Sequence, residues 1–170
     1  AARAADRALD QPGPFGPLPF VDGDITRWNE EYWTRARAHV RTAEEHGITV
    51  LLYPVDSWVL DNSFVPTDVD ACTAYGAEVA ERFADAPNVL WMAGGDYSPE
   101  PEPSGTAVDR CVNGVLTGVR EQGDQRPFSV QLSDGRPMAS TDNPYWRDKV
   151  DWNFVYTYAP THLAVGRARA

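Results

Sequence analysis

The chain has 170 residues, enough for one domain with a substantial core, and 42% of them are hydrophobic, as in ordinary globular proteins. Its formal net charge of -10 disfavours a nucleic acid or an anionic membrane as a partner. No apolar run has the length of a membrane span, and the N-terminal AARAADRALD lacks the apolar stretch of a signal peptide.

The first predicted elements are a loop, a helix and a strand. Residues 1–24 lack strong periodicity, and the prolines and glycines of GPFGPLPF are typical of a loop. Asn29 is a good helix N-cap, apolar residues then recur at helical spacing, and Gly47 ends the helix. The run ITVLLYP follows, and its continuous apolar, β-branched character predicts a strand buried on both faces.

The same alternation continues along the chain. A second helix ends before Pro87 and is followed by the apolar strand NVLWM. A third helix begins near Thr106, where Asp109 completes a pair resembling a capping box, and Gly123 ends it. FSVQL and WNFVYTY are predicted as the third and fourth strands.

This order predicts an α/β fold with a parallel sheet. The first three strands begin near residues 48, 88 and 128, and each is separated from the next by a helix. A doubly wound sheet and a (β/α)₈ barrel both fit the pattern. A whole barrel typically needs ~250 residues, so we expect a single, incomplete barrel domain over residues 1–170, with residues 1–12 and 163–170 as poorly structured tails.

The ends of the predicted strands indicate a binding site. In both parallel architectures, ligands bind at the carboxyl ends of the strands. Three carboxylates and several aromatic rings lie after the predicted strands and are expected to share one rim: Tyr53, Asp56, Trp58, Asp96, Asp134, Trp146, Tyr156 and Tyr158. Aromatic rings stack on sugars, although composition alone favours core packing for the tryptophans and tyrosines.

Asp96 is the candidate catalytic acid. It follows NVLWMAGG, whose two glycines allow the backbone to turn tightly beside a site. A carboxyl group held against apolar walls can act as a general acid at neutral pH. The alternative is that Asp96 caps the next turn, and for Asp56 and Asp134 the role of a structural turn residue is the favoured interpretation.

Other chemistries find no support in the sequence. There is no phosphate-binding glycine motif and no GxSxG nucleophile motif, and the three histidines lack metal-ligand spacing. We therefore expect neither a cofactor nor a metal. Cys72 and Cys111 lie early in consecutive helices, where buried free thiols are favoured over a disulfide because neighbouring helix axes are usually ~8–10 Å apart.

Two long segments resemble a known family. ITRWNEEYWTRARAHVRTAEEHGITVLLYP and YGAEVAERFADAPNVLWMAGGDY are similar to the apiosidase-like glycoside hydrolases, which are (β/α)₈ barrels acting on plant or bacterial polysaccharides. The resemblance covers roughly residues 13–162, includes GPFGPLPF and WNFVYTY, and is most specific in NVLWMAGGD.

The resemblance implies roles for individual residues. Asp96 would be the acid/base at the end of barrel strand 4, and the four predicted strands would be strands 3 to 6 of a retaining glycosidase. An oligo- or polysaccharide would be the substrate, and a secreted or periplasmic location would be expected. The family's nucleophile lies on strand 7, yet no Asp or Glu follows Asp151, and VQLSDG lacks the histidine common after strand 5. We therefore expect impaired activity; a non-catalytic carbohydrate-binding barrel and an unrelated α/β domain are the alternatives.

Overall fold

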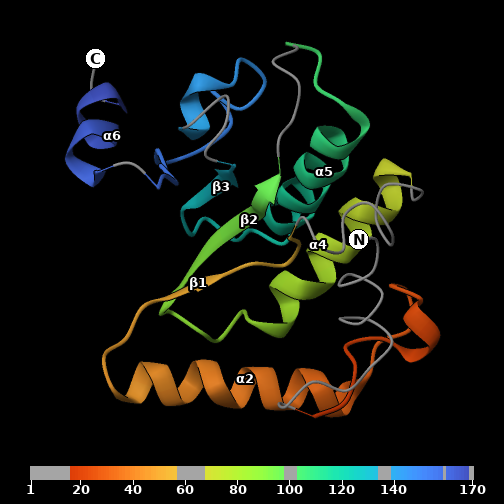
Figure 1. Ribbon diagram of the computed structural model, residues 1–170. Coiled ribbons are helices and arrows are strands. Elements are labelled where there is room, and N and C mark those ends of the chain that lie inside the picture. Colours follow the sequence, from red (N-terminus) through yellow and green to blue (C-terminus); the bar gives the residue numbers. More distant parts are fainter. Residues whose placement is uncertain (1–15, 57–67, 98–102, 134–138, 159, 169–170) are drawn as a thin grey trace.

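A computed structural model describes residues 16–56, 68–97, 103–133, 139–158 and 160–168 and places three parallel strands at its centre (Figure 1). Strands β1 (Val50–Leu52), β2 (Val89–Tyr97) and β3 (Phe128–Leu132) pair in sequential order.

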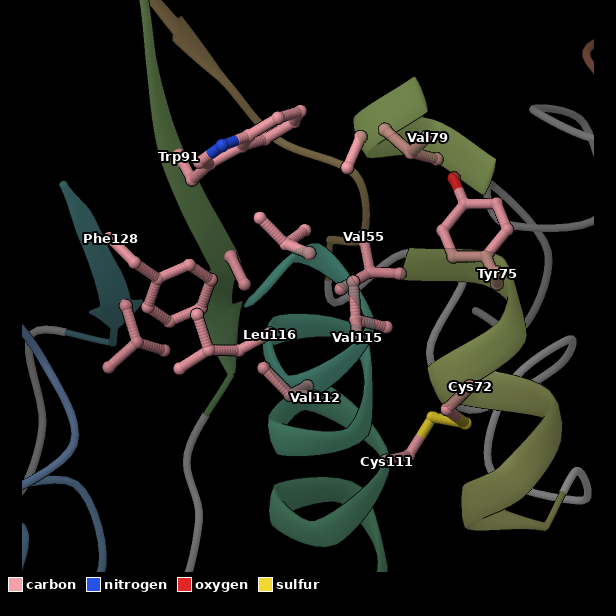
Figure 2. Close-up of a cluster of buried hydrophobic side chains, with 14 of the residues drawn as sticks. Val55, Cys72, Tyr75, Val79, Trp91, Cys111, Val112, Val115, Leu116 and Phe128 are labelled. Atoms are coloured by element: carbon pink, nitrogen blue, oxygen red, sulfur yellow. A yellow bond between two sulfur atoms is a disulfide. The ribbon is translucent and has the colours of Figure 1, made fainter. Parts of the chain in front are cut away.

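Helix α4 (Val69–Arg82) connects β1 to β2, and α5 (Ala107–Glu121) connects β2 to β3. Both helices cover the same face of the sheet (Figure 2). Sequential parallel strands with their helices on one face form part of a (β/α) barrel, since a doubly wound sheet carries helices on both faces.

The predicted helix starts are confirmed. Helix α2 (Glu30–Glu45) begins at Asn29, whose side chain accepts a hydrogen bond from the Glu31 backbone N–H at 3.2 Å. At the start of α5, the Thr106 side chain accepts from the Asp109 N–H, and the Asp109 carboxylate accepts from the Thr106 N–H at 2.7 Å. This capping box fixes the direction in which the chain leaves the end of β2.

The C-terminal part differs from the prediction in two ways. WNFVYTY forms no strand in the described structure; Val155 makes an isolated antiparallel bridge to Ala139, beside the short 3₁₀ helix η3 (Ser140–Asp142). The hydroxyl of the buried Ser129 donates to the carbonyl of Trp152 at 2.8 Å. A side chain thus provides the hydrogen bond that a neighbouring strand would otherwise give to this carbonyl. Residues 163–168, expected in a tail, lie in helix α6 (Thr161–Ala168).

The core lies between the sheet and helices α4 and α5. Phe128 of β3 points toward α5, while the ring of Trp91 in β2 extends toward the side of Val79 in α4 (Figure 2). These side chains are fully buried. Most of the apolar part of β2 is buried, as its sequence predicts. The same prediction for ITVLLYP was wrong, because Leu51 of β1 is 40% exposed.

Aromatic residues also attach the N-terminal part of the chain to α4. The rings of Trp28 and Tyr75 stack with centroids 5.3 Å apart, and the guanidinium of Arg82 lies 4.5 Å from the centroid of Trp28. Arg82 also forms a two-pronged ion pair with Glu30 at the start of α2. Much of the aromatic content of the chain is therefore core rather than ligand-binding surface.

Helices α4 and α5 approach each other more closely than the sequence suggested. A methyl group at Gly76 would lie 2.0 Å from the carbonyl oxygen of Val115, and one at Gly118 would lie 2.0 Å from that of Thr73. The glycines therefore allow direct backbone contact between the two helices.

The close approach also decides the state of the cysteines. Cys72 and Cys111 form a disulfide with their Cα atoms 5.4 Å apart, as Figure 2 shows. The expectation of free thiols was wrong because it assumed ordinary helix spacing.

Substituting these glycines should give a graded loss of stability. We expect Gly76→Ala and Gly118→Ala each to lower the free energy of unfolding by about 2–3 kcal/mol, because the new methyl group meets backbone that cannot rotate away. Gly114→Ala should cost less, since its methyl group would lie 3.0 Å from the nearest atom. Urea unfolding measures all three.

Gly166→Ala is the matched control. Gly166 is a helical glycine of α6 with no atom near the position of an added methyl group. This variant should be neutral or more stable by up to ~1 kcal/mol, since alanine favours the helix. Equal losses at all four positions would show that close helix packing is not the cause.

Candidate functional site

The candidate site lies at the carboxyl ends of the three strands. Register pairs Leu52 with Trp91 and Trp91 with Phe128, so these residues share the helix-covered face. Side chains alternate along a strand, which places Tyr53 and Gln131 on the opposite face. In a barrel this second face is the interior, and its carboxyl end is where ligands bind.

A local irregularity in β2 presents Asp96. Ala93 pairs with Val130 and Tyr97 with Leu132, so four residues of β2 advance against two of β3. Gly94, Gly95 and Asp96 all have positive φ, with values of 104°, 58° and 73°. Asp96 is exposed and adopts a left-handed conformation that non-glycine residues seldom occupy and that often marks functional positions.

Gln131 connects Asp96 to Tyr53 across the three strands. Its Nε2 donates to Oδ1 of Asp96 at 2.6 Å, and its Oε1 accepts from the Tyr53 hydroxyl at 2.7 Å. Burial, and then the negative charge of Asp96, raise the pKa of Tyr53, so this phenol stays protonated and able to donate at neutral pH. The structure therefore brings together two predicted site residues, Tyr53 and Asp96, through one that was not predicted.

Asp56 lies next to this group. It forms an isolated parallel bridge with Gly94, and the Gly94 N–H donates to the carbonyl of Val55 at 3.2 Å. Burial, and then the charge of Asp56, raise the pKa of Tyr32. The bridge brings a second predicted carboxylate beside the glycine pair that precedes Asp96, and Tyr32 of α2 lies close to that carboxylate.

Five predicted site residues remain: Trp58, Asp134, Tyr156, Tyr158 and Trp146. Trp58 and Asp134 lie outside the described residues. The hydroxyl of Tyr156 donates to that of Tyr158 at 2.6 Å, and the Tyr158 ring is largely exposed. These tyrosines form a pair, while their place in a common site with Asp96 stays a prediction.

Trp146 requires a correction. It was expected at the rim, but it is fully buried, and its indole N–H donates to Oδ1 of Asp109 at 2.9 Å. That carboxylate also belongs to the capping box of α5. Trp146 thus holds the segment after η3 against the start of α5, and we remove it from the candidate site.

Gln131 had a sequence signal that was not used. It is the one long polar side chain in FSVQL, an otherwise apolar or small segment predicted to be buried. A polar group at such a position needs a hydrogen-bonding partner. Because Gln131 lies near the carboxyl end of its strand, that partner is expected among the side chains at the carboxyl ends of the neighbouring strands. Which partner it finds depends on the register with β2.

A separate hollow of about 410 Å³ lies between α2 and the end of α4, lined in part by Arg37, Arg41, Phe83 and Asp85. These residues precede β1 and β2, so the hollow is at the end of the sheet opposite Asp96. The described residues contain no cluster of His, Cys, Asp and Glu suited to a metal. No helix in the described ranges has both the length and the hydrophobicity needed to cross a bilayer.

Comparison with known proteins relates the chain to a family. A family model described as "Apiosidase-like, catalytic domain" matches residues 2–168. No curated protein sequence matches the chain.

Two solved structures are similar in fold. A glycoside hydrolase family 5 protein from Bacteroides vulgatus ATCC 8482 superimposes with a TM-score of 0.67 at 22% identity, covering 86% of this chain and 31% of that chain. A second structure, titled "Glycoside hydrolase", gives a TM-score of 0.64 at 23% identity, covering 84% of this chain and 31% of that chain. The chain thus spans about a third of the length of either protein.

Proposed function

The chain belongs to the apiosidase-like catalytic domain family, and from that premise we propose that it supplies Asp96 as the acid/base of a retaining glycoside hydrolase. It is a glycosidase by family, with a (β/α)-barrel fold. The observation that carries the proposal is the position of Asp96: an exposed carboxylate at the carboxyl end of β2, in a left-handed conformation after two glycines.

The proposed reaction has two steps. Asp96 first protonates the glycosidic oxygen while a second carboxylate, about 5–5.5 Å away, attacks the anomeric carbon and forms a glycosyl-enzyme. Asp96, now ionised, then removes a proton from water as the water attacks the same carbon and releases the sugar. Both steps need the carboxyl group of Asp96 to face the substrate oxygen directly, and its exposure is compatible with that.

The substrate class rests on the family and on the chemistry of the rim. We propose an oligo- or polysaccharide of plant or bacterial origin. Tyr53 and Asp56, with Trp58, Asp134, Tyr156 and Tyr158, are the side chains proposed to bind sugar rings and hydroxyl groups. No cofactor is needed for acid/base hydrolysis of this type.

The nucleophile is proposed to lie outside this chain. No Asp or Glu follows Asp151, and the chain spans about a third of the solved relatives. Asp56 is the described carboxylate beside the Gly94–Gly95 pair, and it is the alternative nucleophile within the chain.

The disulfide supports a proposal about the compartment. Disulfides persist in oxidising environments and are rare in the cytosol. The Cys72–Cys111 bond therefore favours a secreted or periplasmic protein.

An assay of two chain lengths tests the proposed function. The 170-residue chain and a version continued through further barrel strands are incubated with plant cell-wall oligosaccharides, and reducing ends are measured. We expect turnover by the longer version and little by the shorter, because retention needs two carboxylates. Robust turnover by the short chain that is lost in Asp56→Asn would move the nucleophile to Asp56; sugar binding without turnover at either length would favour the carbohydrate-binding barrel.

A further inference from the structure

We propose that Gln131 is a positioning residue for catalysis, which holds Oδ1 of Asp96 and so presents Oδ2 as the oxygen that exchanges a proton with the substrate. This inference rests on the proposed role of Asp96. It assigns a function to a residue of β3 through its contacts with the ends of β1 and β2.

The hydrogen-bonding chemistry fixes the orientation of the Gln131 amide. Oδ1 of Asp96 accepts a hydrogen bond whether Oδ2 carries the proton or has lost it, so the NH₂ group of Gln131 faces Asp96. Its carbonyl oxygen then faces Tyr53, whose hydroxyl must donate. A tyrosine phenol is protonated at neutral pH, so this donor is present, and burial followed by the charge of Asp96 raises the pKa of Tyr53 further.

The geometry of Asp96 explains why such support is needed. Asp96 is the last of three successive residues with positive φ. These residues lie between the pairs Ala93–Val130 and Tyr97–Leu132 and do not pair regularly with β3. An exposed aspartate side chain in such a segment can adopt several rotamers. A donor on the neighbouring strand selects one of them, and the bond from Tyr53 prevents that donor from turning.

The bond to Oδ1 also distinguishes the two carboxylate oxygens. Oδ1 accepts from an amide N–H, and this bond favours negative charge on that oxygen. Oδ2 is then the oxygen that carries the proton to the glycosidic oxygen and later receives one from water. Holding the carboxylate in this orientation should affect the rate of bond cleavage and leave substrate binding almost unchanged.

The test uses the version continued through further barrel strands and compares Gln131→Met with Asp96→Asn. Methionine has a similar length but cannot donate to Asp96. We expect Gln131→Met to lower kcat on oligosaccharides by roughly 10- to 100-fold with little change in KM, as expected for a misplaced catalytic group. On aryl glycosides with activated leaving groups, which need little protonation, kcat/KM should stay close to wild type.

A double-mutant cycle separates positioning from folding. Tyr53→Phe should lower kcat less than Gln131→Met does, and adding it to Gln131→Met should lower kcat little further, because both act on kcat through the same carboxylate. A weaker hold of Tyr53 on the sugar would appear in KM instead. Additive losses in kcat, or equal losses on both leaving-group classes with lower thermal stability, would show a structural role and overturn the inference.

Two outcomes separate this inference from the function on which it depends. If Asp96→Asn keeps wild-type activity, the proposed function fails. If Asp96→Asn abolishes activity while Gln131→Met matches wild type, the inference alone fails.

NMR titration of the tyrosines of the 170-residue chain supplies a readout that does not depend on activity. Asp96→Asn should lower the raised pKa of Tyr53 toward the ordinary tyrosine value, since one of its causes is removed. The exposed, distant Asp148→Asn should not change it. An unchanged Tyr53 pKa in Asp96→Asn would show that the two side chains are farther apart than a shared bond to Gln131 requires, and would overturn the inference.

Discussion

Asp96→Asn is expected to lower kcat/KM on oligosaccharides by about 10²–10⁴-fold in the catalytically complete protein, the usual contribution of a positioned general acid. Asparagine suits the test because, like aspartate, it tolerates the left-handed backbone found here at φ 73°. Its side-chain oxygen can still accept from Gln131, so the hydrogen-bond network keeps its shape while the transferable proton is lost.

The dependence on the leaving group identifies which function is lost. An activated aryl group departs with little help from an acid, so kcat/KM for such a glycoside should fall much less than for an oligosaccharide. Asp148→Asn changes an exposed turn carboxylate and should behave as wild type. Activity within twofold of wild type in Asp96→Asn would remove it from the mechanism and leave Asp56 as the described carboxylate to examine.

The second large effect is expected from the disulfide. Cys72 and Cys111 are 39 positions apart, so their bond restricts a long loop of the unfolded chain. Breaking a loop of this size should lower the free energy of unfolding by about 4 kcal/mol and the Tm by roughly 10 °C. Thermal unfolding with and without dithiothreitol measures the change, and thiol titration confirms that the bond is reduced.

The control for this experiment is Cys72→Ala combined with Cys111→Ala. This variant should unfold near the Tm of the reduced protein, and its Tm should not respond to dithiothreitol. If the native protein titrates two free thiols before reduction, the disulfide assignment is wrong. If the bond is present but its reduction leaves the Tm unchanged, the tight packing of α4 on α5 already restricts the chain.

Much of the fold follows from local sequence. Asn29, and Thr106 with Asp109, mark helix starts because their side chains satisfy backbone groups close in sequence. The apolar runs ITVLLYP, NVLWM and FSVQL contain the three strands. The predicted burial holds for β3 and most of β2, but Leu51 of β1 is exposed, because an apolar run does not say how many neighbours cover it. WNFVYTY has the same appearance without forming a strand, since its partners come from Ser129, Ser140 and the η3 segment.

The sequence predicted where the candidate side chains lie along the strands, but not which of them meet. Parallel strands end at one edge, so the rule that ligands bind there selected Tyr53 and Asp96 from sequence. The same rule also selected Trp146, which the structure places in the core as a donor to Asp109. Position after a strand does not say whether a side chain turns outward or inward.

The sequence by itself determined the alternation of helices and strands, the parallel sheet and the place of Asp96 at a strand end, because these depend on periodicity and on neighbours in the chain. The tertiary structure decided which residues meet across elements. Gly76 and Gly118 bring α4 and α5 close enough for the Cys72–Cys111 bond. The shift between Ala93 and Tyr97 sets the register that brings Gln131 to Asp96. Helix separation and strand register arise from packing over the whole domain, so no local segment encodes them.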